Sequence, residues 1–166
     1  MRNIFFVFLM IIAGGVYVSA QTKATALSIL TKSESAVKWN AKSEIKGDFD
    51  YDGVTDYALR GKEGKFFVLG IVRGASSVEP KHYLIEFGED AGDQGSLCSA
   101  IRAVITVENI DKDYTKFAVD YLETDFTRTL ESVSKHSTGI NIADGMCDSF
   151  HVLWDKKTKH FFWWRI

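Results

Sequence analysis

Short runs of alternating apolar and polar residues predict that this chain is built mainly from β-strands. Residues 57–60 and 65–72 are rich in aromatic and β-branched side chains and are separated by a glycine-containing turn. Residues 82–87 alternate between polar and apolar positions, and two aromatic runs, 149–154 and 160–165, flank a short polar turn. Successive side chains of a strand point to opposite faces, so these patterns predict antiparallel strands joined as hairpins.

One helix is expected before the strands begin. Residues 24–39 carry Leu27, Leu30 and Val37 at near-helical spacing, with Ser, Thr and Lys between them. This periodicity predicts a short helix packed against the sheet. The predicted fold class is therefore mainly β, with minor α+β character: an antiparallel sheet domain with one or two short helices.

The remaining stretches give weaker signals. Residues 73–81, which contain the single proline, and the glycine-rich residues 89–95 are expected to be loops. Residues 100–107 are apolar and β-branched near their end, so a strand is favoured over a short helix. Residues 116–122 are also expected to form a strand, whereas residues 128–139 are polar and ambiguous.

The first twenty residues have the layout of a secretory signal peptide. Arg2 is their only charge, residues 4–12 form an apolar core, and small residues at 18–20 precede an expected cut after Ala20. A membrane anchor is the alternative, but the uninterrupted apolar run is short for a bilayer. We therefore expect residues 1–20 to be removed and the mature chain to be periplasmic or secreted, with no membrane span.

Length and charge point to one domain without an obvious nucleic-acid partner. The chain has 166 residues, and those after the expected cut, residues 21–166, suit a single β-rich domain. Lys and Arg number 20 against 22 Asp and Glu, for a formal net charge of −2. Because the basic residues are scattered rather than grouped, nucleic acid is not expected as a partner.

Two cysteines, Cys98 and Cys147, lie in the expected mature chain. In an oxidising compartment two thiols permit a single intramolecular bridge, and we expect these two to form it. Two separate buried thiols are the alternative.

Four carboxylates are grouped in residues 48–56, hereafter the acidic loop, with the sequence Asp-Phe-Asp-Tyr-Asp-Gly-Val-Thr-Asp. Carboxylates at every second position can turn toward one point, and Gly53 permits the sharp backbone bend that follows them. Ca²⁺ takes six to eight oxygen ligands, which such a loop can supply. The predicted calcium ligands are the side chains of Asp48, Asp50, Asp52 and Asp56 and the carbonyl oxygen of Val54. A metal-free polar turn is the alternative.

The acidic loop is not a complete EF-hand, because Leu59 stands where that motif has a bidentate glutamate. Residues 47–59 instead resemble the calcium loop of FG-GAP or VCBS-type repeats, which carry D-x-D-x-D-G-x-x-D and then enter a strand. The resemblance implies the same five calcium ligands. One copy is present, so the propellers that such repeats build are not expected. The chain also resembles small secreted bacterial proteins of uncharacterised family.

No catalytic motif stands out, and an enzyme is not expected. The histidines lack metal-ligand spacing, and there is no phosphate-binding glycine motif. The aromatic residues near the C-terminus suit core packing better than a binding surface. The first hypothesis is an exported calcium-binding protein with a structural ion, which binds an envelope or extracellular protein or a glycan. The alternatives are a periplasmic inhibitor or immunity protein that blocks an enzyme and, as a minor one, a calcium-dependent hydrolase.

Overall fold

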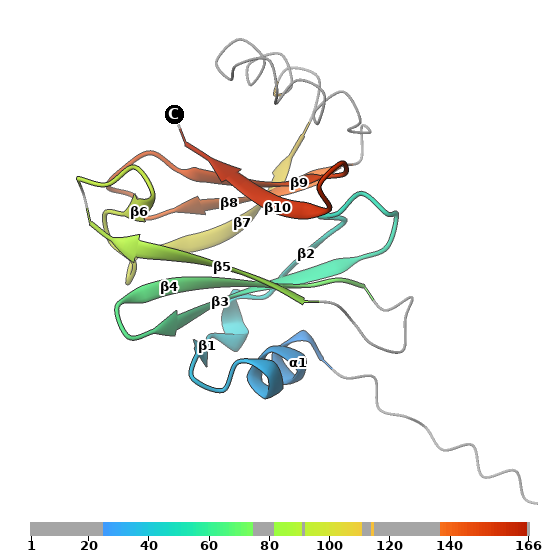
Figure 1. Ribbon diagram of the computed structural model, residues 1–166, viewed down its shortest axis with the longest axis horizontal. Coiled ribbons are helices and arrows are strands. Elements are labelled where there is room, and N and C mark those ends of the chain that lie inside the picture. Colours follow the sequence, from blue (N-terminus) through green and yellow to red (C-terminus); the bar gives the residue numbers. More distant parts are fainter. Residues whose placement is uncertain (1–24, 75–81, 91, 111–113, 115–136, 166) are drawn as a thin grey trace, which may run out of the picture.

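The computed structural model describes residues 25–74, 82–90, 92–110, 114 and 137–165. These residues form three layers: a helix, a six-stranded sheet and a four-stranded sheet (Figure 1). The two sheets pack face to face, and the helix covers the outer face of the larger sheet. The mainly β fold class predicted from the sequence is confirmed.

The larger sheet has the strand order β1-β3-β4-β5-β6, and β2 also pairs with β3. All of its pairs are antiparallel except the short parallel pairing of β5 with β6. The predicted hairpin is confirmed as β3 and β4, in register from Tyr57 opposite Val72 to Glu63 opposite Phe66. The strands are β1 (Lys38–Trp39), β2 (Ile45–Gly47), β3 (Asp56–Glu63), β4 (Phe66–Val72), β5 (His82–Glu89) and β6 (Ser96–Leu97).

The smaller sheet has the order β10-β9-β8-β7 and is antiparallel throughout. The predicted terminal aromatic hairpin is confirmed as β9 and β10. Its strands are β7 (Val104–Asn109), β8 (Thr138–Ala143), β9 (Phe150–Asp155) and β10 (His160–Trp164).

The predicted helix is confirmed as α1 (Ala26–Ser33), which is shorter than the expected 24–39. The Thr25 hydroxyl caps it by accepting the N–H of Ser28 at 3.2 Å, which satisfies one of the N–H groups left over at a helix start. A single 3₁₀ turn, η1 (Ala41–Ser43), follows later.

From Phe67 onward the strand β4 is buried on both faces, which explains its unbroken apolar sequence. Phe67, Leu69 and Ile71 belong to the core between the two sheets. On the other face, Val72 packs in the cluster formed with α1, where Leu30 is fully buried. A central strand covered on both sides has no solvent-facing positions and therefore loses the polar alternation of a surface strand.

Two sequence expectations differ from the structure. The strand expected over 100–107 begins at Val104, because residues 100–102 form a turn in which the N–H of Arg102 donates to Ser99 O. In the segment left ambiguous, β8 begins at Thr138 and continues through Ile140 and Ile142, both fully buried. The expected strand over 116–122 and the expected signal peptide over 1–20 lie outside the described residues. Within the described part, no helix has the length and apolar character needed to cross a membrane.

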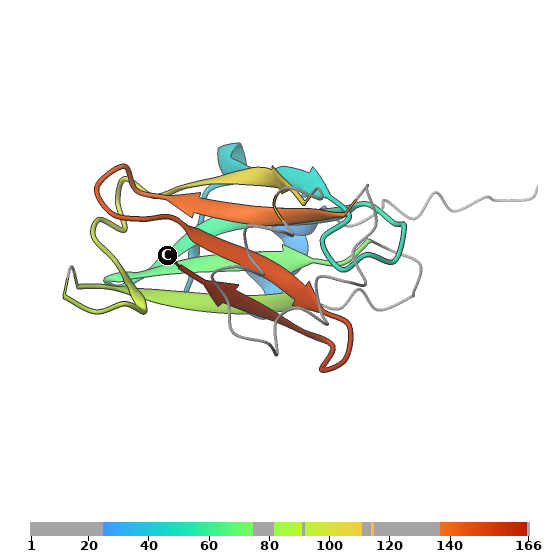
Figure 2. The ribbon, with the colours of Figure 1, turned by 90° about the horizontal axis from the view of Figure 1, so that it is seen from above.

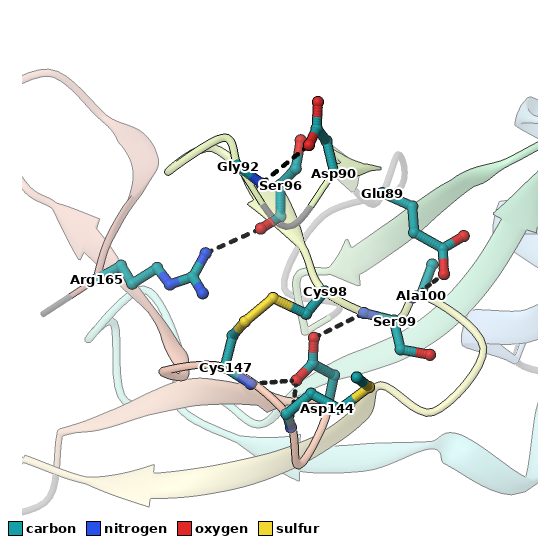
Figure 3. Close-up of a disulfide and its surroundings, with 11 residues drawn as sticks. Glu89, Asp90, Gly92, Ser96, Cys98, Ser99, Ala100, Asp144, Cys147 and Arg165 are labelled. Carbon is teal, nitrogen blue, oxygen red and sulfur yellow. Dashed lines mark hydrogen bonds between the residues drawn. A yellow bond between two sulfur atoms is a disulfide. The ribbon is translucent and has the colours of Figure 1, made fainter.

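The predicted disulfide is present and ties the two sheets together at one end (Figure 3). Cys98 follows β6 of the larger sheet, whereas Cys147 lies between β8 and β9 of the smaller one, and their Cα atoms are 5.9 Å apart. Arg165, directly after β10, also reaches this end and donates to Ser96 O at 2.9 Å.

Asp144 organises the backbone around the disulfide, a role that the sequence did not reveal (Figure 3). One carboxylate oxygen accepts the N–H groups of Met146 at 2.8 Å and Cys147 at 3.0 Å, and the other accepts Ser99 N–H at 2.9 Å. Burial pushes the pKa of Asp144 upward, but these N–H donors together outweigh burial and hold the pKa below its ordinary value. The ionised side chain thus joins the segments on both sides of the bridge.

The substitution Asp144→Asn is expected to lower the free energy of unfolding by about 1–3 kcal/mol at neutral pH, because the amide NH₂ cannot accept a backbone N–H. The folded pKa lies below the unfolded one, so this stabilisation is present above the unfolded pKa of about 4 and is lost as the pH falls further. Urea unfolding of the wild type and the variant at pH 7 and pH 3 measures the loss of unfolding free energy and its pH dependence. An equal difference between wild type and variant at the two pH values would contradict the assigned role.

Candidate metal centre

The acidic loop connects β2 to β3 and is anchored in the core between the sheets. Gly47 pairs with Asp56 at its base. The side chain of Phe49 is only 1% exposed and packs among the residues of both sheets. Thr138, at the start of β8, donates its hydroxyl to Asp48 O at 3.2 Å. The loop is therefore positioned by both layers of the sandwich.

The fully buried carboxylate of Asp56 closes the base of the loop. One oxygen accepts the N–H groups of Phe49 at 2.9 Å and Asp50 at 3.2 Å, and the other accepts Gly74 N–H at 2.7 Å. These bonds satisfy three backbone donors and fasten the loop to the chain that follows β4.

The tip of the loop is folded around Asp48. Its two oxygens accept the N–H groups of Asp52 and Gly53, each at 3.0 Å. Gly53 has φ 86°, which is the left-handed conformation expected from its position after the third aspartate. Tyr51 also has a positive φ, 60°, and its ring packs with Leu153 and Trp164 on the outer side of the smaller sheet.

Three of the predicted ligands converge. Asp48, Asp50 and Asp56 each offer a carboxylate oxygen, and these oxygens lie within 4.8 Å of one another. Two oxygen ligands of one metal ion at about 2.3–2.6 Å from it can be up to roughly 5 Å apart, so the triad has a spacing that can hold a metal ion. Within the described residues, no other group of three or more His, Cys, Asp or Glu side chains converges in this way.

The other two predicted ligands lie outside this triad. Asp52 accepts Val54 N–H at 2.8 Å and forms an ion pair with Arg73, whose Nη2 lies 3.1 Å from its carboxylate. The Nε of Arg73 also contacts Asp50. The guanidinium therefore partly neutralises the acidic loop.

Arg73 was missed by the sequence reasoning, although a signal for it existed. In the β3–β4 hairpin Tyr57 pairs with Val72, which places Arg73 beside Asp56 one position further on. The register follows from the turn at Gly64, so a cation at this point can be deduced once the hairpin is assumed.

Burial makes two carboxylates of the loop, those of Asp50 and Asp56, reluctant to ionise. It raises the pKa of Asp56 to about 6. The hydrogen bond from the Gly74 N–H lowers this pKa, whereas the negative charge of Asp50 raises it further. Burial likewise raises the pKa of Asp50, and the nearby positive charge of Arg73 counteracts this effect. A bound divalent cation would relieve the same cost, because it favours the ionised form of every carboxylate around it.

Comparison with protein-family models, with curated proteins and with solved structures found no match for this chain. The geometry of the acidic loop is therefore the basis on which a function is proposed.

Proposed function

We propose that this chain is an exported calcium-binding protein in which the ion is structural and which acts by binding another molecule rather than by catalysis. The observation that carries this proposal is the convergence of three carboxylates, from Asp48, Asp50 and Asp56, on a loop anchored in the core. The likeness of the loop to FG-GAP or VCBS-type repeats supports it. The disulfide between Cys98 and Cys147 suits the oxidising conditions outside the cytoplasm.

The triad would supply side-chain oxygens to the ion. Asp52 and the Val54 carbonyl belong to the proposed ligand set through the loop motif, and Asp52 exchanges its Arg73 partner for calcium. A hard cation bound by oxygens neutralises carboxylates that otherwise repel one another. In this role calcium stabilises the folded loop, and the partner is an envelope or extracellular protein or a glycan.

Adding 10 mM calcium to the chelated protein is expected to raise its melting temperature by roughly 5–10 °C. Extracellular calcium modules have dissociation constants of about 10⁻⁴–10⁻³ M, so 10 mM calcium is a ten- to hundredfold excess and stabilises the folded state by about 1.4–2.7 kcal/mol. Differential scanning calorimetry of the mature chain with chelator and with calcium measures the shift.

The variants Asp50→Ala and Asp48→Asn are expected to remove this calcium response. Asp90→Asn is the matched control, because Asp90 lies outside the loop and its side chain accepts the Gly92 N–H at 2.9 Å, which an amide oxygen can also accept. Superimposable melting curves of the wild type with and without calcium would refute the proposed function.

A further inference from the structure

A cleft opens beside the acidic loop and has not yet been assigned a role. Its volume is about 610 Å³, within the range of small-molecule sites. The acidic loop and the turn between β9 and β10 lie at the same end of the sandwich in both views (Figures 1 and 2). Its described lining includes Asp50, Arg73, Tyr83, Trp154, Lys156 and Lys159.

The cleft has a mostly cationic lining with one aromatic wall. Arg73, Lys156 and Lys159 contribute positive charges, whereas Asp50 is the only acidic residue in the part of the lining that the structure describes. Tyr83 and Trp154 form the wall, with ring centroids 5.5 Å apart in an edge-to-face arrangement. Cations gathered in a concave site raise the local concentration of anions.

The turn that carries the lysines is itself well ordered by hydrogen bonds. The carboxylate of Asp155 accepts the N–H of Lys157 and the hydroxyl of Thr158, both at 2.8 Å. The N–H of Lys159 donates to the backbone carbonyl of Asp155 at 2.8 Å. The carboxylate of Asp155 is thus engaged within the turn and is absent from the cleft lining. The positive groups are consequently presented on a defined scaffold.

Arg73 connects the cleft to the acidic loop. Its guanidinium contacts Asp50 and Asp52 on one side and lies 5.9 Å from the centre of the Trp154 ring on the other. A calcium ion on Asp50 competes with the guanidinium for the same carboxylate and repels it. Calcium binding thereby leaves more of the positive charge of Arg73 available to the cleft.

We propose that this cleft binds a small anionic ligand, held by Arg73, Lys156 and Lys159, and that calcium in the acidic loop strengthens its binding. The calcium part rests on the proposed function. The recognised chemistry is an oxyanion group, which a uronic-acid sugar and a phosphate both carry. Arg supplies paired N–H donors that match such a group, and the lysines add charge.

The coupling between the two sites has a predictable size and is reciprocal. A doubly charged ion within about 10 Å of an anion in water changes its affinity by roughly three- to tenfold. Thermodynamic linkage requires that the anion raise the calcium affinity by the same factor. Because solvent-exposed charges are screened, the factor falls as salt is added.

Isothermal titration calorimetry of the mature protein tests this proposal with three probes: digalacturonate, inorganic phosphate and the neutral disaccharide lactose. Each is titrated in chelator and in saturating calcium, and calcium alone is titrated first. We expect digalacturonate or phosphate to bind at least threefold more tightly with calcium and lactose not to bind. Which of the two anions binds more tightly identifies the source of the oxyanion group.

Two variants localise the binding. The double variant Lys156→Gln/Lys159→Gln removes two cleft charges and keeps every carboxylate of the acidic loop, although it also removes the ammonium of Lys156 that lies 5.6 Å from the centre of the Tyr51 ring. It is expected to weaken anion binding roughly tenfold while calcium binding persists. Lys65→Gln is the control, because Lys65 lies in the turn at the opposite end of the β3–β4 hairpin and should leave anion affinity unchanged.

The outcomes separate the two proposals. Three results would overturn the cleft proposal if the heats of calcium binding are normal: no anion binding, equal anion affinity in chelator and in calcium, or full anion affinity in the double lysine variant. Each of them would leave the structural calcium site intact. Absence of any calcium heat would instead refute the proposed function and, with it, the calcium dependence of the cleft.

Discussion

Replacing both Cys98 and Cys147 by serine is expected to lower the free energy of unfolding by about 4 kcal/mol. The bridge joins residues 49 positions apart, and closing a loop of that length restricts the unfolded chain by roughly this amount. It also fastens β6 of the larger sheet to the connection between β8 and β9 of the smaller one. Urea unfolding followed by tryptophan fluorescence, with the double variant compared with the oxidised wild type, gives the difference.

Chemical reduction of the wild type is the matching control, because it breaks the same disulfide bond without replacing any side chain. The reduced wild type and the double serine variant should unfold at closely similar urea concentrations. If the variant were as stable as the oxidised wild type, packing and hydrogen bonds such as those of Asp144 and Arg165 would be sufficient to hold the sheets together at this end.

The substitution Asp56→Ala is expected to lower the free energy of unfolding by about 3–5 kcal/mol even in the presence of chelator. It leaves three N–H groups without their acceptor: those of Phe49 and Asp50, which are buried, and that of Gly74, which is half-buried. Each buried donor left unsatisfied costs about 1–3 kcal/mol. Urea unfolding in chelator measures this structural contribution separately from that of calcium, and repeating it with calcium tests the loss of the metal response.

Asp56→Asn distinguishes the hydrogen-bonding role from the charge. Its amide oxygen can still accept the two N–H groups from the loop, so a smaller cost of about 1–2 kcal/mol is expected in chelator. Both variants should lose most of the calcium stabilisation. An alanine variant as stable as the wild type in chelator would show that Asp56 does not hold the loop together.

Local patterns were sufficient for most of the described strands. The aromatic and β-branched runs of β4, β9 and β10 bury large side chains, and their turn residues define hairpins with little dependence on the rest of the chain. The strand β8 was missed because its alternating residues Ile140 and Ile142 follow a polar stretch. The helix was placed correctly but extended too far, since Glu34, whose N–H still bonds to Leu30 O, ends it.

For the candidate site, the spacing of acidic residues by itself identified the loop, because alternation along an extended chain and a glycine at the bend are local properties. Only the tertiary structure decided which carboxylates meet. It brought Asp48, Asp50 and Asp56 together and paired Asp52 with Arg73.

Sequence by itself therefore determined the mainly β character, the two hairpins, the acidic loop and the pair of cysteines available for a bridge. Tertiary structure decided the stacking of the sheets, the burial of Asp56, the anchoring role of Asp144 and the cleft between the acidic loop and the β9–β10 turn. The physical reason is the distance along the chain over which each interaction acts. Strand and turn preferences act between near neighbours, whereas these contacts join segments far apart in the chain that meet only when the two sheets pack.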